Sequence, residues 1–163
     1  MICAFTGHRP ERLPWGRNED DARCLALKTL LRRTVQEVYA RGFSTFLCGM
    51  ARGCDQYFAE AVLAAKDAGL APDARLCALV PCPSQPDGWS AAAQARYQAL
   101  LAACDTVEIL EPAYSPGCML RRNCEMLRRA QLLISVFDGG PGGTASTVRR
   151  AQQSGIELLP LWL

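Results

Sequence analysis

The sequence contains little of what metal-binding, membrane and nucleic-acid-binding proteins rely on. Among its 163 residues there is one histidine, His8, and there are two lysines, Lys28 and Lys66. No apolar stretch approaches the ~20 residues that a membrane-spanning helix needs. The net charge of +2, from 18 basic and 16 acidic side chains, is too small to favour nucleic acid by itself. We therefore expect a chain that binds neither a membrane nor nucleic acid.

Cysteine pairs of the zinc-binding type are also missing, although the chain has nine cysteines. No two of them are separated by just two residues, and a single histidine cannot make up for that. The odd count argues against a disulfide framework, and the apolar run at the start shows no export signal, so we expect a cytoplasmic protein. We expect no metal, no cofactor and no disulfide. Cys54 and Cys118, which lie beside glycines, are the two candidates for a reactive thiol.

Short apolar runs alternate with segments of helical periodicity along the whole chain. The runs predict strands, most of them buried on both faces of a sheet, and they are Ile2–Thr6, Ser44–Cys48, Arg75–Val80, Thr106–Leu110, Leu132–Phe137 and Glu157–Leu161. The segments that predict helices are 20–41, 55–68, 90–104, 120–130 and 145–154. This alternation predicts one domain over residues 1–163. Its fold class is α/β, a Rossmann-like three-layer αβα sandwich with a mainly parallel, about six-stranded sheet.

Glycines and polar residues follow three of the predicted strands. Ligands of open parallel sheets bind beyond the carboxyl ends of the strands, close to where the strand order reverses. We expect the first strand to be central and the fifth to lie beside it, so that their loops share one cleft. The candidate ligand-binding residues are Thr6, Gly7, His8, Arg9, Gly49, Arg52, Gly53, Asp55, Asp138, Gly140, Gly142, Gly143 and Thr144.

The run GGPGGT at residues 139–144 has a direct use in anion binding. Glycines let a ligand approach the backbone, and a helix starting near Thr144 presents free N–H groups and the positive end of its dipole. A plain turn with Thr144 as the helix N-cap is the alternative, although four glycines are more than a turn needs. No lysine follows the run, so it is not a Walker A loop.

The charged residues near these loops each have two interpretations. Asp55 either caps the next helix or accepts hydrogen bonds from ribose hydroxyls while Arg52 contacts a phosphate. His8 is either a hydrogen-bonded loop residue or a catalyst. Glu60 lies about 140° around the helix from Asp55, so the two carboxylates form no obvious acid/base pair. The arginine pair at 121–122 is expected on a solvated face.

Three motifs taken together point to a known family: FTGHRP at 5–10, GMARGCD at 49–55 followed by Glu60, and GGPGGT at 139–144. With these motifs the chain resembles the SLOG superfamily of Rossmann-like proteins, named after DNA-processing protein A and the LOG hydrolases, and in particular its YpsA-like branch of unknown function. The resemblance implies a nucleotide or nucleotide-derived ligand in this pocket. LOG hydrolases carry a catalytic glutamate three residues after the loop threonine, where this chain has Thr147. Hydrolysis would therefore need Asp55 or Glu60 as its carboxylate.

We expect a module that binds or senses a small-molecule nucleotide derivative with a phosphate group at the C-terminal edge of the sheet. The second interpretation is a hydrolase or transferase acting on the N-glycosidic bond of nucleoside monophosphates, with Asp55 or Glu60 as the catalytic candidate. The third is single-stranded DNA binding like that of DNA-processing protein A, which the scarcity of lysine disfavours. The sequence leaves open whether the chain is an enzyme and whether it forms a homo-oligomer.

Overall fold

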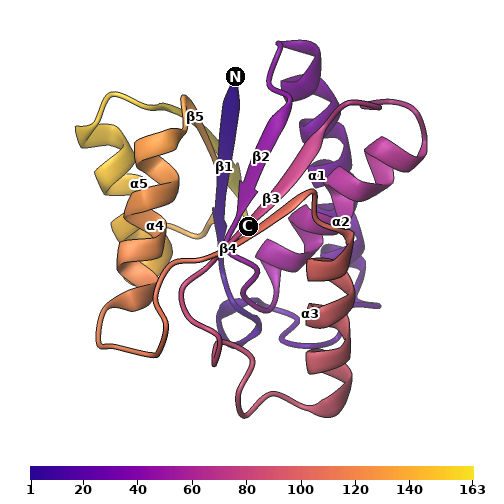
Figure 1. Cartoon of the computed structure of the whole chain (residues 1–163). Coiled ribbons are helices and arrows are strands. Elements are labelled where there is room, and N and C mark those ends of the chain that lie inside the picture. Colours follow the sequence, from indigo (N-terminus) through magenta and orange to yellow (C-terminus); the bar gives the residue numbers. More distant parts are fainter.

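One parallel sheet contains all six strands of the chain, and the computed structural model describes residues 1–163 (Figure 1). The strands lie in the order β4-β3-β2-β1-β5-β6, and every neighbouring pair runs parallel. Their bounds are β1 (Ile2–Gly7), β2 (Thr45–Cys48), β3 (Arg75–Val80), β4 (Thr106–Ile109), β5 (Leu132–Phe137) and β6 (Glu157–Trp162). All six predicted strands are confirmed, and the sheet is entirely rather than mainly parallel.

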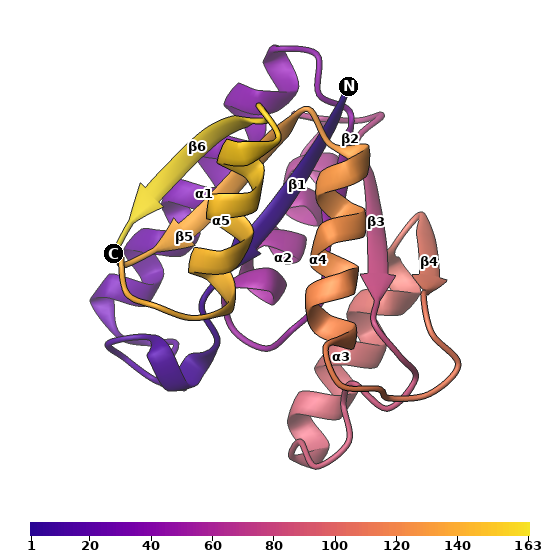
Figure 2. The same ribbon diagram turned by 90° about the vertical axis from the view of Figure 1, so that its left-hand side faces the viewer.

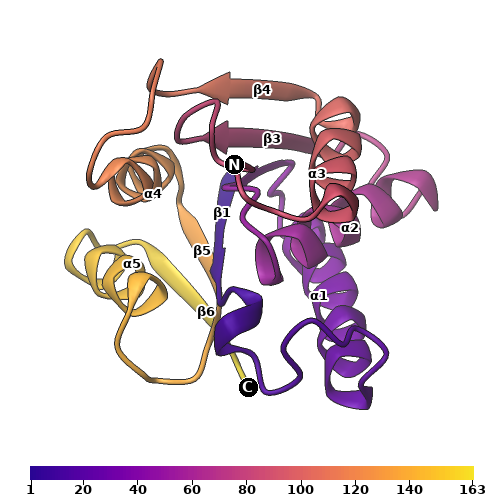
Figure 3. The same cartoon turned by 90° about the horizontal axis from the view of Figure 1, so that it is seen from below.

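Five α-helices cover the sheet, with α1, α2 and α3 on one face and α4 and α5 on the other (Figure 3). Their bounds are α1 (Ala22–Ala40), α2 (Cys54–Asp67), α3 (Ala91–Ala103), α4 (Cys118–Arg129) and α5 (Gly143–Gln153), and a 3-10 turn, η1 (Pro10–Arg12), follows β1. The predicted fold class, a three-layer Rossmann-like α/β sandwich, is confirmed. None of the helices combines the length and the hydropathy that a membrane crossing requires.

Two apolar layers hold the helices on the sheet. The larger layer lies under α1, α2 and α3 and includes the stacked rings of Phe5 and Phe58, whose centroids are 4.4 Å apart. The smaller layer lies under α4 and α5 and includes Leu133 and Ala151. Because β1 and β5 are covered on both faces, close packing fixes where their carboxyl ends and the following loops lie.

The strand order reverses between β1 and β5. The chain runs from β1 outward to β4, and β5 then returns to the other side of β1. Gly7 at the end of β1 pairs with Val136 of β5, so the loops that follow the two strands start side by side. The starts of α4 and α5 lie at the ends toward which the strands point (Figure 2). The prediction that β1 is central and next to β5 is confirmed.

Strand β4 is an exception to the expectation that most of the strands are buried on both faces. All four of its residues are exposed, with Val107 at 44% and Ile109 at 52% of their full accessible area. The physical reason is its position, because β4 forms the edge of the sheet and the helices on both faces pack on strands nearer the middle.

The structure also corrects the expectation that Cys54 and Cys118 are candidates for a reactive thiol. Both are buried at the first residues of helices, with Cys54 at 0% and Cys118 at 1% exposure. Burial raises the pKa of the Cys54 thiol well above its usual range. A glycine neighbour in the sequence therefore did not indicate an accessible thiol at either position. All nine cysteines are free thiols, and Cys104 and Cys124 are partly exposed.

Candidate functional site

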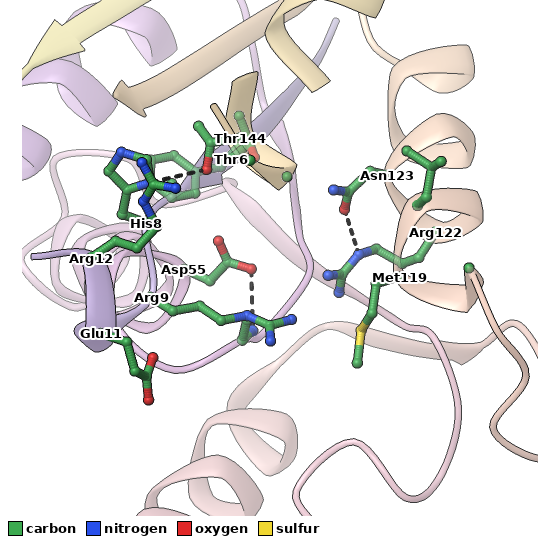
Figure 4. A pocket seen from close by; sticks show the side chains of 17 residues that line it. Thr6, His8, Arg9, Glu11, Arg12, Asp55, Met119, Arg122, Asn123 and Thr144 are labelled. Carbon is green, nitrogen blue, oxygen red and sulfur yellow. Dashed lines mark hydrogen bonds between the residues drawn. The ribbon is translucent and has the colours of Figure 1, made fainter. Parts of the chain in front are cut away.

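A cavity of about 500 Å³ opens at the carboxyl end of the sheet, between the loop after β1 and the first turns of α4 and α5 (Figure 4). We call it the main cavity. Of the residues predicted from the sequence, those that line it are Thr6, Gly7, His8, Arg9, Asp55, Gly142, Gly143 and Thr144. The structure therefore brings together residues from the loops after β1, β2 and β5, as expected for a site where the strand order reverses.

The first turn of α5 presents free backbone N–H groups to the main cavity. The amide N–H groups of Gly143, Thr144 and Ala145 have no acceptor within the chain, and Gly142, at the N-cap, provides no side-chain cap. A Cβ atom at Gly143 would meet nothing within 4 Å. Thr144 is the second residue of the helix, so the expectation that it could be the helix N-cap is wrong.

The remaining glycines of the predicted set serve packing. A Cβ atom at Gly7 would lie 2.5 Å from the Cβ of Cys54, so this glycine lets the end of β1 approach α2. Gly53 has a φ of +86°, and a Cβ there would lie 2.8 Å from the carbonyl oxygen of His8. Gly140 lies against the guanidinium group of Arg12. Gly49 lies against the guanidinium group of Arg122, a buried residue of α4. Gly7 and Gly53 are therefore required by contacts with atoms held by the backbone, whereas the contacts of Gly49 and Gly140 are with the ends of arginine side chains.

His8 connects the loop after β1 to the loop after β5. The residue is 3% exposed, and its Nε2 atom lies 2.9 Å from Oδ1 of Asp138. Its Nδ1 atom lies 3.4 Å from the hydroxyl of Thr144. The Gly140 N–H, the His8 ring and the Arg12 guanidinium together lower the pKa of Asp138 to about 2, so this carboxylate is ionised at neutral pH. Asp138 does not itself line the main cavity, but it contacts His8, which does.

Arg122 is a site residue that the sequence did not indicate. We expected the arginine pair at 121–122 on a solvated face, and this is wrong for Arg122, which is 3% exposed and lines the main cavity. It donates hydrogen bonds to the carbonyl oxygens of Gly49 and Leu79 and, at 2.7 Å, to Oδ1 of Asn123. Its Nη2 atom has no partner. Burial lowers the pKa of this guanidinium from a very high ordinary value, so Arg122 remains a cation.

Asp55 is the carboxylate that faces the main cavity. It is 7% exposed, and its Oδ2 atom accepts the backbone N–H of Ala51 at 3.1 Å. Burial raises its pKa, while the charge of Arg122, the Ala51 N–H and the charge of Arg9 oppose that rise. The carboxylate thus has one oxygen fixed by the backbone and no hydrogen bond to the other.

Arg9 and Arg12 occupy different positions although both follow β1. The Arg9 side chain extends toward the middle of the main cavity (Figure 4) and makes no hydrogen bond or ion pair with the chain. Arg12, which is not among the residues predicted from the sequence, donates a hydrogen bond to the carbonyl of Pro141 and lies 3.7 Å from Asp138. It therefore packs on the glycine loop, and Arg9 remains free to contact a ligand.

Besides Asp138, two charged residues considered from the sequence, Arg52 and Glu60, lie outside the main cavity. Arg52 forms an ion pair with Glu11 at 2.8 Å and stacks over the ring of Trp89. Glu60 accepts two hydrogen bonds from Arg96, at 2.8 and 3.0 Å, on the face of α2 that looks toward α3. Of the two carboxylates considered for catalysis, the main cavity contains Asp55.

An all-parallel sheet whose strand order reverses beside a glycine loop defines a Rossmann-like α/β protein. The chain belongs to the YspA SLOG family, whose model matches residues 3–156. The resemblance inferred from the three sequence motifs, to the YpsA-like branch of the SLOG superfamily, is confirmed.

The sequence identity between this chain and its individual relatives is low. A UPF0398 protein of Bacillus licheniformis is 26% identical over 158 residues, which cover 93% of this chain and 85% of that protein. A UPF0398 protein of Shouchella clausii is 28% identical over 114 residues, or 69% of this chain and 60% of that protein. DNA processing protein A from Helicobacter pylori, solved for its single-stranded DNA binding mode, is similar in structure with a TM-score of 0.63. That match has 17% identity, covers 98% of this chain and spans 64% of the other, and it shows a shared fold.

Proposed function

We propose that the chain binds a nucleotide or nucleotide-derived ligand whose phosphate group lies at the N-terminus of α5. The observation that carries the proposal is a convergence of free donors at one cavity. They are the N–H groups at the start of α5, the unpaired Arg9 and the Nη2 atom of Arg122. An anion placed there gains charge-assisted hydrogen bonds and the favourable end of the helix dipole. The cavity volume falls within the ~300–1,000 Å³ range of small-molecule sites.

Thermal-shift measurements with a ligand panel test this proposal. The panel contains nucleoside monophosphates and diphosphates, the matching unphosphorylated nucleosides and inorganic phosphate. We expect phosphorylated nucleosides to raise the melting temperature and the unphosphorylated ones to leave it unchanged, since the phosphate makes the main contacts. A ligand present at 100 times its Kd stabilises the fold by about 2.7 kcal/mol, which is readily measured. Equal shifts with and without the phosphate would contradict the proposal.

Asp55 supports a second candidate function, cleavage of an N-glycosidic bond in the bound nucleotide. A carboxylate of raised pKa with one free oxygen, inside the cavity and opposite cationic groups, has the chemistry to stabilise an oxocarbenium-like transition state. Release of free base from nucleoside monophosphates measures this activity. It should disappear in Asp55→Asn and persist in Glu60→Gln, because Glu60 is paired with Arg96 outside the cavity.

The DNA-binding description of the Helicobacter pylori protein adds one arm to the ligand panel, a short single-stranded oligodeoxythymidine. The main cavity contains a buried carboxylate, Asp55, and the whole chain has only two lysines. A strand-binding groove instead needs a continuous basic surface with stacking side chains. We therefore expect no stabilisation by the oligonucleotide under conditions in which a nucleoside monophosphate stabilises the chain.

A further inference from the structure

Asp55 and Arg122 lie in the main cavity without contacting each other. The two residues are 7% and 3% exposed, and both line the cavity. Among the charges that act on Asp55, that of Arg122 has the largest effect, yet no hydrogen bond or ion pair joins the two side chains. Buried charges are costly unless they are paired. A group that contacts both side chains would complete the pair.

Backbone contacts fix each of the two side chains on one side. Oδ2 of Asp55 accepts the N–H of Ala51 at 3.1 Å, and Nη1 of Arg122 donates to the carbonyl oxygens of Gly49 and Leu79. The other ends, Oδ1 of Asp55 and Nη2 of Arg122, have no partner within the chain. Both atoms keep accessible surface, since neither is among the fully buried polar atoms that lack a partner. A ligand in the main cavity can therefore contact both.

The two free atoms have opposite hydrogen-bonding character, and both side chains point into the main cavity (Figure 4). A carboxylate oxygen accepts hydrogen bonds, whereas a guanidinium nitrogen donates them. An ionised phosphate offers acceptors alone and would bring a negative charge to Asp55. A hydroxyl group both donates and accepts. Two neighbouring hydroxyl groups can therefore donate one hydrogen bond to Asp55 and accept another from Arg122.

We propose that Asp55 and Arg122 bind the 2′- and 3′-hydroxyl groups of a ribose, so that the main cavity selects ribonucleotides over deoxyribonucleotides. The inference rests on the proposed function, in which the phosphate of the same ligand lies at the start of α5. It divides the free donors of the cavity: the α5 amides and Arg9 face the phosphate, and Nη2 of Arg122 faces the sugar. Within a nucleotide the sugar is bonded to the phosphate, so it lies nearer to the phosphate site than the base does.

The sugar and phosphate contacts come from different walls of the main cavity. Asp55 belongs to the first turn of α2 and Gly143 to that of α5, and these helices cover opposite faces of the sheet (Figure 3). Both residues nevertheless line the same cavity of about 500 Å³. A cavity of this size accommodates a small molecule rather than a single ion, so one ligand can contact both walls.

Nucleotides that lack single hydroxyl groups test the proposal in the full chain. Adenosine, guanosine, cytidine and uridine 5′-monophosphates are compared with their 2′-deoxy and 3′-deoxy analogues by calorimetric titration. We expect each missing hydroxyl to weaken binding about tenfold or more, because it leaves a buried charged group without its hydrogen bond. Equal affinities with and without the hydroxyls would overturn the proposal. A dependence on the base alone would assign Asp55 and Arg122 to the base instead.

Asp55→Asn tests the contribution of the carboxylate. The asparagine oxygen can still accept the Ala51 N–H, but its amide group then presents a donor where the ribose needs an acceptor. We expect the preference for ribonucleotides to fall about tenfold or more, while binding still depends on the phosphate. Glu60→Gln is the matched control, because this carboxylate of the same helix pairs with Arg96 outside the cavity. An undiminished preference in a folded Asp55→Asn would mean that Asp55 does not contact the ribose.

Backbone amide resonances distinguish the failure of this proposal from that of the proposed function. The Ala51 amide reports on Asp55, to which it donates, and the Gly143 amide reports on the phosphate. If Gly143 responds equally to ribo- and deoxyribonucleotides and Ala51 distinguishes neither, the phosphate site stands and the ribose proposal fails. If Ala51 responds to ribonucleosides with or without a phosphate and Gly143 does not respond, the phosphate site fails and the ribose contact stands. No response of either amide to any nucleotide overturns both.

Discussion

The Nε2 atom of His8 lies 2.9 Å from the Oδ1 atom of Asp138, and this contact joins two loops that are 130 residues apart in the chain. On the other side of the same ring, Nδ1 faces the hydroxyl of Thr144. His8 thereby sets the position of the glycine loop relative to the end of β1. The free donors at the start of α5 are held in place by this contact before any ligand arrives.

Asp138→Asn should destabilise the fold at neutral pH, and the difference from the wild type should vanish in acid. The folded-state pKa of about 2 lies below the ordinary value of 3.8. The ionised carboxylate therefore stabilises the fold above the ordinary pKa, and that contribution is lost as the pH falls from 3.8 to about 2. Urea unfolding of both proteins over this range measures the difference. A difference that is the same at every pH would show that the charge of Asp138 plays no part.

Arg122→Met should lower the free energy of unfolding by about 3–5 kcal/mol, the usual cost of removing one buried charged partner. The substitution removes one donor each from the carbonyl oxygens of Gly49 and Leu79, and it removes the cation whose charge most opposes the rise in the pKa of the buried Asp55. Arg121→Met is the matched control, because Arg121 is exposed and pairs with Glu111 on the surface. Urea unfolding compares the two variants, and equal losses would contradict the buried role of Arg122.

Much of the fold followed from the sequence because buried parallel strands appear as short apolar runs and the helices between them as periodic segments. The site was predictable in part, because an all-parallel sheet brings every loop that follows a strand to one edge. Arg122 was missed because a loop from residue 110 to residue 117 separates it from β4. The signal that would have found it is topological: each helix of such a sheet begins at the same edge, so the N-terminal half of α4, which includes Arg122, lies near the site.

The roles of individual residues depended on packing that no local pattern contains. Gly7 and Gly53 look like ligand-binding glycines in the sequence, yet they permit contacts with Cys54 and with the carbonyl of His8. Glu60 follows the second loop at the spacing of a site residue, but an arginine of α3 pairs with it away from the cavity. In each case a partner that is distant in the chain decides the role of the residue.

Gly143→Val should abolish stabilisation by a nucleotide while the protein keeps its secondary structure. A Cβ atom at this position meets nothing within 4 Å, and the backbone is helical, so the valine fits the fold. Its side chain occupies space in front of the free N–H groups and blocks a phosphate. Ala22→Val, at the exposed first residue of α1, controls for a β-branched residue at a helix start. Circular dichroism and thermal shift measure both effects, and undiminished stabilisation of Gly143→Val would contradict the role of the loop.

Arg9→Ala should weaken nucleotide binding by about 1.5–3 kcal/mol, the value of a hydrogen bond to a charged group. The unfolding midpoint without ligand should change much less than in Arg122→Met, because Arg9 makes no hydrogen bond or ion pair within the chain and acts on the buried Asp55 only through its charge. Arg32→Ala, on the exposed surface of α1, is the control for loss of one positive charge. Calorimetric titration measures the affinities. Equal weakening in both variants would mean that Arg9 acts only through the net charge.

The most direct test of the central claim follows the amide resonances of Gly143, Thr144 and Ala145 while a nucleoside monophosphate is added to the ¹⁵N-labelled chain. These three N–H groups have no acceptor in the structure, so a phosphate that binds at the start of α5 must change their environment. The predicted result is a saturable shift of all three resonances that is absent when the unphosphorylated nucleoside is added. Resonances that stay in place across a panel of nucleoside monophosphates would contradict the claim.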